Sequence, residues 1–157
     1  MIVYRLARTR FKNDLSGRGA EIAGGRWNSI GIPALYTGES RALCALEIAV
    51  HTPLNVVPKD YLLITLEIPG HIKIEEVFLK DLPPDWKSFP EVRYTQTLGD
   101  RFFREGKYLA LKVPSAIIRG DHNIILNPFH EDFKLVKVVS AEPFEFDQRL
   151  FIKPAEA

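Results

Sequence analysis

The side chain at position 47 is a carboxylate in an otherwise apolar stretch. Between residues 42 and 50, Glu47 is the only polar side chain apart from the thiol of Cys44. A buried carboxylate is costly unless it has a partner. Glu47 is therefore expected either to pair with a buried base, for which Arg26 or Arg5 is the natural choice, or to act in a site. The residues alone leave both alternatives open.

The segment Gly24-Gly25-Arg26-Trp27-Asn28 is the second place where the residue types could do chemistry. The two glycines let the backbone approach a ligand closely, and Arg26 offers a planar fork for phosphate or carboxylate. Trp27 offers a stacking face, and Asn28 can recognise an amide or a hydroxyl. Together these residues suit a nucleotide. A turn with a core tryptophan and a surface arginine explains the segment about as well.

Other chemistry-bearing residues carry weaker signals. Ser115 and Asn127 each follow an expected strand, where such residues usually form turns. Cys44, in the run Ala-Leu-Cys-Ala-Leu, is better explained as a buried structural thiol than as a nucleophile. The segment starting at Gly17 begins like a dinucleotide fingerprint but lacks its third glycine, so we expect a flexible loop there.

Composition sets the class of protein. The chain has 157 residues, of which 46% are hydrophobic, enough to close one core. We expect a single domain over residues 1–152 and a frayed tail over 153–157. The four histidines show no metal-ligand spacing, and no apolar run approaches the length of a membrane span. One cysteine fits a reducing cytosol, so a cytoplasmic protein without a metal or membrane is expected.

Charge is unevenly distributed along the chain. Residues 1–30 carry six bases and two acids, whereas residues 31–157 carry 15 bases and 18 acids. A basic N-terminal region suits an anionic partner, either a nucleic acid or a phosphorylated small molecule. A solvated basic surface is the alternative explanation.

Strand patterns dominate the chain. Leu62, Ile64, Leu66 and Ile68 alternate on one face of an expected strand. Residues 72–76 follow Pro69-Gly70 and are predicted to pair with that strand as a hairpin. The other expected strands span residues 1–6, 34–37, 109–113, 123–126 and 135–139, with an edge strand at 142–146.

Two helices are expected among these strands. Ser40 can cap a helix that runs to about Val50. The capping-box spacing of Ser88 and Glu91 predicts the start of a second helix, which Gly106 can end. Many strands with a few inserted helices, and no regular alternation of strand and helix, indicate an α+β fold.

Together these motifs resemble the RES domain, the toxin component of bacterial RES–Xre toxin–antitoxin pairs. Tyr36 lies ten residues after Arg26, and Glu47 lies eleven after Tyr36, which agrees with the spacing in that family. The likeness covers nearly the whole chain. The matching segments are Tyr4-Arg5-Leu6-Ala7, Gly25-Arg26-Trp27-Asn28, Leu35-Tyr36-Thr37-Gly38, Ala45-Leu46-Glu47, Val113-Pro114-Ser115 and Leu126-Asn127-Pro128.

The resemblance implies a fold similar to ADP-ribosyltransferases, with antiparallel sheets that enclose an NAD cleft. It implies an enzyme that consumes NAD+ by cleaving the nicotinamide–ribose bond, as a glycohydrolase or phosphorylase, and so inhibits growth. NAD+ is then the substrate, with no cofactor and no metal required. Transfer of ADP-ribose to a protein is the alternative within this chemistry.

The resemblance also suggests a role for each matched residue. Arg26, helped by Arg5, would hold the pyrophosphate or the ribose hydroxyls, and Tyr36 would orient the nicotinamide. Glu47 would stabilise the ribosyl cation or activate the incoming water or phosphate. Ser115 would hydrogen-bond the dinucleotide or a neighbouring catalytic side chain. Trp27, Asn28 and Asn127 are further substrate-binding candidates.

The implied protein partner is an Xre-type antitoxin with a helix-turn-helix domain. Such an antitoxin covers the active site and represses the operon, so DNA would be reached only through it. The resemblance is also compatible with a homodimer. Outside enzymology, a small nucleic-acid-binding module that uses the basic N-terminal region is the competing hypothesis, and it leaves Glu47 unexplained. A relative that has lost catalysis and only binds a partner is a further alternative.

Overall fold

Over residues 1–152, the protein has one seven-stranded β-sheet, which packs around a hydrophobic core together with three α-helices. The computed structural model describes residues 1–152, so the expected frayed tail at 153–157 lies outside the described residues. The strands are β1 (Ile2–Arg8), β2 (Leu35–Gly38), β3 (Tyr61–Glu67), β4 (Glu75–Glu76), β5 (Ala110–Pro114), β6 (His122–Leu126) and β7 (Lys137–Phe144). The helices are α1 (Arg18–Ala23), α2 (Arg41–Val50) and α3 (Arg93–Glu105).

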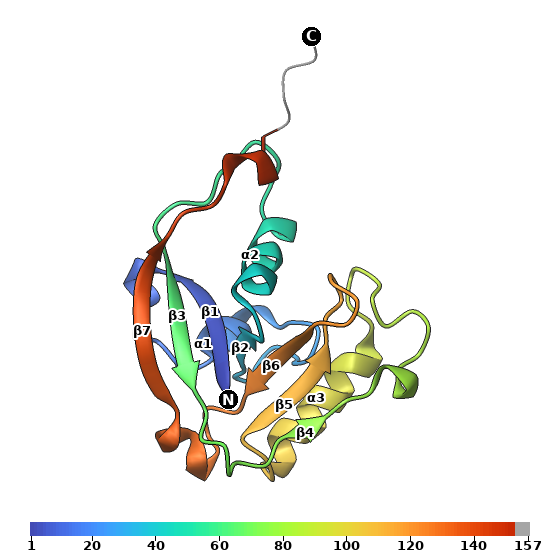
Figure 1. Cartoon of the computed structure of the whole chain (residues 1–157). Coiled ribbons are helices and arrows are strands. Elements are labelled where there is room, and N and C mark those ends of the chain that lie inside the picture. The colour runs from blue at the N-terminus through green and yellow to red at the C-terminus, as the bar shows by residue number, and fades with distance from the viewer. Residues whose placement is uncertain (153–157) are drawn as a thin grey trace.

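The seven strands follow the order β4-β5-β6-β2-β1-β3-β7. All neighbours pair antiparallel except β4 and β5. β1 is in register with β3 from Ile2 to Arg8, but it meets β2 at one pair alone, Tyr4 with Gly38. The sheet therefore divides at this junction into two arms, β7-β3-β1 and β2-β6-β5-β4, which diverge in Figure 1.

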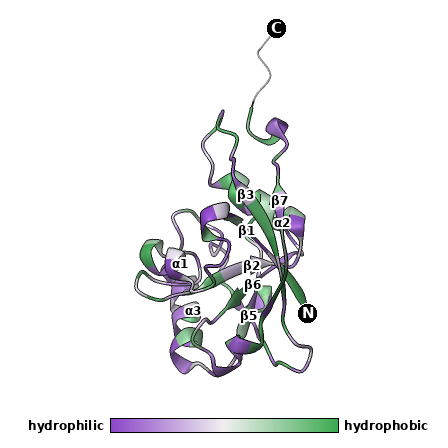
Figure 2. Ribbon diagram, turned by 90° about the vertical axis from the view of Figure 1, so that its left-hand side faces the viewer, coloured by the Kyte–Doolittle hydropathy of each residue, from purple (hydrophilic) through white to green (hydrophobic). Residues whose placement is uncertain are grey.

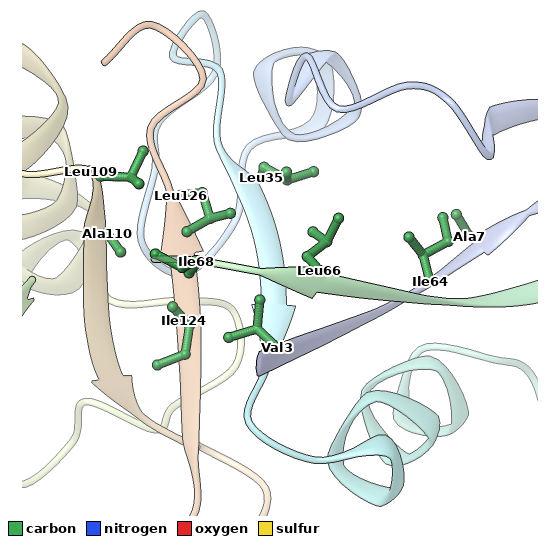
Figure 3. Close-up of a cluster of buried hydrophobic side chains, with 10 residues drawn as sticks. All are labelled: Val3, Ala7, Leu35, Ile64, Leu66, Ile68, Leu109, Ala110, Ile124 and Leu126. Atoms are coloured by element: carbon green, nitrogen blue, oxygen red, sulfur yellow. The ribbon is translucent and has the colours of Figure 1, made fainter. Parts of the chain in front are cut away.

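The main core fills the space between the two arms. Val3 and Ile64 come from one arm and Ile124 and Leu126 from the other, and each is at most 1% exposed. Figure 3 shows ten side chains of this cluster. The ribbon is hydrophobic along β3 and β6 (Figure 2). Burying each aliphatic side chain stabilises the fold by roughly 1.5–3 kcal/mol.

Helix α2 begins and ends where the sequence predicts. The Ser40 hydroxyl accepts a hydrogen bond from the Leu43 amide at 3.1 Å, which caps the helix. The helix packs on β1, and the Cys44 thiol donates to the Tyr4 carbonyl at 3.1 Å. Gly38 permits this contact, because a Cβ there would lie 2.9 Å from the Cys44 sulfur. These contacts hold α2 across the junction of the arms (Figure 1).

Helix α3 ends at Gly106 as predicted, but the capping-box prediction is wrong. The helix begins at Arg93, after Val92, whose side chain makes no capping hydrogen bond. Phe89 precedes Pro90, a position that disfavours helical backbone. The segment before the helix is therefore a loop, and α3 lies behind β5 (Figure 1).

Three other expectations are corrected. The segment after Gly17 is not a flexible loop but the short helix α1. Gly17 starts it at a φ of 72°, and a Cβ there would lie 2.6 Å from the Ala34 nitrogen. Residues 72–76 do not form a hairpin with β3, because β4 pairs in parallel with β5 in the other arm. The two strands expected at 135–139 and 142–146 are one strand, β7.

Within residues 1–152, no helix combines the length and the apolar character needed to cross a membrane.

Candidate active site

A cavity of about 640 Å³ opens beside α2, where the ends of several segments meet. Its size falls in the range of small-molecule sites in proteins. Helix α2 contributes Glu47 and His51, and β2 contributes Tyr36. The segment from α1 to Trp27 and the loop before α3 form other walls, and the ends of β5 and β6 complete the lining. The cavity thus joins residues that lie far apart in the sequence.

Glu47 lies half-buried in this cavity and its partner is an amide. The Asn123 side chain, from β6, donates to Glu47 Oε1 at 3.1 Å. Burial raises the pKa of Glu47 above its ordinary value, and the hydrogen bond from Asn123 opposes that rise. Of the two alternatives left open by the sequence, the ion pair with Arg26 or Arg5 is not formed, because no arginine in the described part of the chain lies within 4.0 Å of the carboxylate.

Arg26 lines the same cavity, and its guanidinium holds the loop before α3. Nη1 donates to the carbonyls of Trp86 at 2.6 Å and Ser88 at 3.2 Å, and Nη2 donates to that of Lys87 at 3.4 Å. This loop places Lys87, Phe89 and Glu91 on the cavity wall. Because carbonyls carry no net charge, the positive charge of Arg26 remains available to a ligand.

The Tyr36 ring lines the cavity while its hydroxyl shapes the wall. The hydroxyl accepts from the Trp27 amide at 3.0 Å and donates to Asn28 Oδ1 at 2.8 Å. Burial raises the pKa of Tyr36 above its ordinary value, so the phenol stays protonated. A Cβ at Gly25 would lie 2.7 Å from the Tyr36 oxygen. Glycine at 25 is therefore required by this close approach.

Trp27 and Asn28 differ in their access to the cavity. Trp27 lines it but is 3% exposed and packs against Trp86, with ring centroids 6.2 Å apart. Asn28 is fully buried behind the wall, where its amide donates to the carbonyls of Ala20 at 2.8 Å and Ile32 at 2.9 Å. Asn28 therefore holds the backbone of the wall in place.

Three other predicted residues are not among those that line the cavity. The Ser115 hydroxyl accepts from the amides of Ile117 and Ile118 at 3.1 Å each, which shapes a turn that does line it. Arg5 is largely buried and donates to the Asp14 carbonyl. Asn127 Oδ1 accepts from the Phe129 amide at 3.0 Å in a turn.

Helix α3 supports the wall from behind through contacts that no sequence pattern predicts. Gln96 donates to the Gly25 carbonyl at 3.0 Å, and Asp100 accepts from the Ser29 amide at 2.8 Å and its hydroxyl at 2.7 Å. Gly99 passes so close that a Cβ there would lie 1.7 Å from the Trp27 oxygen. These contacts fix the segment that carries Arg26.

The cavity also contains four polar residues that were not predicted from the sequence: Asn123, His51, Lys87 and Glu91. Two of them had a usable signal. His51 is four residues after Glu47, the spacing of one helical face, and Asn123 begins an apolar strand run. Lys87 and Glu91 lie in an irregular loop, where no periodicity shows which way a side chain points.

Cys44 lies beside the cavity but is not suited to nucleophilic attack. It is 6% exposed, and burial raises the pKa of its thiol to about 12. The thiol is therefore protonated at neutral pH, in agreement with the structural role predicted for it.

Comparison with known proteins assigns the chain to a family. Residues 2–147 match the model of the RES domain. A protein named Toxin Res from Photorhabdus laumondii is 37% identical over 152 residues, which span 96% of this chain and 97% of that protein. The Prs ADP-ribosylating toxin of Sphingobium sp. (strain YBL2) is 34% identical over 149 residues, which span 94% of this chain and 92% of that protein.

A solved structure shares the fold. In the crystal structure of the M. tuberculosis MbcT–MbcA toxin–antitoxin complex, one chain superposes with a TM-score of 0.73 at 20% identity. The match covers 96% of this chain and 86% of that chain. The α+β, ADP-ribosyltransferase-like fold predicted from the sequence is confirmed. The extent of the domain match and the identity to the curated relatives show that the chain belongs to the RES-domain family.

Proposed function

We propose that this protein is the toxin of a toxin–antitoxin pair and consumes NAD+ by cleaving its nicotinamide–ribose bond. One observation carries the proposal: the half-buried carboxylate of Glu47 shares a single cavity with the guanidinium of Arg26. A glycosidic cleavage needs a negative group beside the developing cation and a positive group for the phosphates. The family and the relatives named as toxins support the same assignment.

The charges of the cavity match the two ends of NAD+. Arg26 and Lys87 provide positive charge for the pyrophosphate, and the Tyr36 ring offers a face for the nicotinamide. Glu47 stabilises the ribosyl cation as the bond breaks. The nicotinamide leaves as a neutral molecule with the bonding electron pair. Water or phosphate then bonds to the ribose carbon and gives up a proton.

The remaining predicted residues support this site indirectly. Ser115 shapes the turn of the cavity wall through its hydroxyl, and Asn28 fixes the opposite wall. Arg5 and Asn127 lie outside the lining, so we assign the positive charge at the pyrophosphate to Lys87 with Arg26. No cofactor and no metal take part in the proposed reaction.

The proposed partner is an antitoxin protein of the Xre type, which would carry the DNA-binding helix-turn-helix domain. The M. tuberculosis chain of the same fold was crystallised in a toxin–antitoxin complex, which supports a protein partner here. With NAD+ as substrate, we place the reaction in the cytoplasm.

Transfer of ADP-ribose to a protein is a second candidate function. The Sphingobium relative is named an ADP-ribosylating toxin, and it matches this chain over nearly its whole length. The bond that breaks in NAD+ would be the same, and a protein side chain would replace water or phosphate as the acceptor.

The decisive experiment incubates the purified protein with NAD+, with and without phosphate, and identifies the products. We expect ADP-ribose from hydrolysis or ADP-ribose 1″-phosphate from phosphorolysis. Label from NAD+ on a macromolecule would instead show protein modification. Glu47→Gln preserves the shape of the side chain and removes its charge, and it should lower the rate at least about 100-fold. A folded Glu47→Gln protein that consumes NAD+ at the wild-type rate would refute the role of Glu47.

A further inference from the structure

Asn123 contacts the carboxylate on which the proposed reaction depends. It belongs to β6, where it pairs with Gly38 of β2 and Val113 of β5. Its backbone is thus fixed on both sides by the sheet. Its side-chain amide donates to Glu47 Oε1 at 3.1 Å, and both side chains line the cavity.

The other charged and titratable groups around Glu47 cannot replace this contact. Arg26 and His51 favour the charged carboxylate through space alone, and burial disfavours it. None of the ion pairs within residues 1–152 includes Glu47. The titratable side chains that face the same cavity or lie against Glu47 are His51 and Cys44 of α2, Arg26, Tyr36 of β2, and Lys87 and Glu91 of the loop before α3.

We propose that Asn123 is a positioning residue for Glu47, whose amide keeps the carboxylate charged and fixes its direction in the cavity. An amide donor stabilises a carboxylate and leaves its negative charge in place. An arginine at the same position would neutralise that charge. The charge therefore remains available to the ribosyl cation. This inference rests on the proposed function.

Two variants test the proposal. Asn123→Ala removes the donor, and Asn123→Asp keeps the shape but places a second carboxylate against Glu47. In both, protonation of Glu47 should become easier, so its pKa should rise. We expect the acidic limb of the pH–rate profile of NAD+ consumption to move to higher pH. At neutral pH kcat should fall about 10- to 150-fold, the range of a hydrogen bond to a charged group, with KM changed much less.

A measurement without NAD+ separates this inference from the proposed function. The Glu47 carboxyl is followed by NMR in carbon-13-labelled protein and assigned by its loss in Glu47→Gln. Its titration midpoint should be higher in both Asn123 variants than in the wild type. If the midpoint is higher in the two Asn123 variants but the wild type does not consume NAD+, the proposed function fails while the Asn123–Glu47 coupling stands.

The control is His122→Gln, at the neighbouring position on β6. The His122 imidazole lies 3.4 Å from the carboxylate of Glu39 and does not contact Glu47. The His122→Gln variant should leave both the midpoint and the pH–rate profile unchanged. Asn123 is not a positioning residue if folded Asn123→Ala and Asn123→Asp keep the wild-type midpoint. The same conclusion follows if the midpoint moves while the acidic limb stays in place.

Discussion

Arg26 has a proposed role in binding the ligand and an observed role in holding the fold. The sequence suggests a phosphate fork, and the structure shows that the same guanidinium also holds the carbonyls of Trp86, Lys87 and Ser88. The guanidinium has five N–H donors in a fixed planar fork, so it can contact three successive carbonyls and keep its charge. Arg26 therefore positions the part of the wall that contains Lys87.

Arg26→Lys distinguishes the contribution of the positive charge from that of the planar hydrogen-bonding geometry of the guanidinium. Lysine keeps the positive charge but cannot reach the three carbonyls in the same geometry. We expect kcat/KM for NAD+ to fall roughly 10- to 100-fold, and the free energy of unfolding to fall by about 1–2 kcal/mol as hydrogen bonds are lost. Steady-state kinetics and urea unfolding measure the two effects.

The matched control is Arg18→Lys, on the first residue of α1, outside the cavity lining. It should change neither quantity. Wild-type kinetics and stability in Arg26→Lys would show that charge alone suffices at this position.

At the scale of elements, local patterns predict most of the strands. Alternation over residues 61–68 predicts β3, and the hydroxyl of Ser40 predicts the start of α2. The failures occur where long-range contacts override local patterns. Helix α1 forms although Gly19 lies within it, and Gly17, which precedes it, passes so close to Ala34 that no Cβ fits there. The helix expected from Ser88 starts later, where the loop held by Arg26 ends.

In the candidate site, too, some residues are predicted from local sequence and others depend on long-range contacts. Glu47 and Arg26 are conspicuous in the sequence, because a charge in an apolar helix and an arginine after two glycines each require an explanation. Asn123 and Lys87 are not, since their contribution depends on strands and loops that meet only in the folded chain. Local sequence therefore indicates the two candidate reactive groups but not the residues that surround them in the cavity.

Gly99→Ala tests whether α3 supports the active-site wall. In a helix interior alanine is favoured over glycine by about 1 kcal/mol. Here its Cβ would lie 1.7 Å from the Trp27 oxygen, so either α3 or the segment with Arg26 must move. We expect a net loss of about 1–3 kcal/mol in the free energy of unfolding, with lower NAD+ consumption. Urea unfolding and kinetics provide the measurements.

Gly70→Ala serves as its control, because no heavy atom lies within 4 Å of a Cβ there. Its stability should stay within about 0.5 kcal/mol of the wild type. If Gly99→Ala proved as stable and active as the Gly70 variant, the close approach of α3 would have no consequence for the site.

At the scale of the whole molecule, the two arms are arranged so that a cavity with charged side chains in its wall lies beside an apolar core. Residues of β2 and β6 that are about 90 positions apart become neighbours, as in the pair of Leu35 with Leu126. No local pattern encodes this pairing. Helix α2 packs across the junction of the arms and presents Glu47 to the cavity. The stability of the fold and the placement of the carboxylate therefore depend on the same junction.

Glu47, the proposed catalytic carboxylate, should reduce the stability of the folded protein at neutral and higher pH. Burial raises its pKa in the folded state, so the folded protein binds a proton more readily than the unfolded chain does. Stability is then lost as the pH rises above the ordinary range of a glutamate and through the raised pKa. Glu47→Gln lacks this loss and should be more stable at pH 8, by about 0.5–2 kcal/mol, the usual range of a stabilising substitution.

Urea unfolding across pH 5 to 8 measures this difference, which should shrink as the pH falls and wild-type Glu47 takes up a proton. Glu67→Gln on β3 is the control, because Glu67 is exposed and its removal should change stability by less than about 0.5 kcal/mol at any pH. A Glu47→Gln protein less stable than the wild type at pH 8 would mean that Asn123 and Arg26 more than offset the cost of burial. The carboxylate would then stabilise the fold, and its charge would need no catalytic explanation.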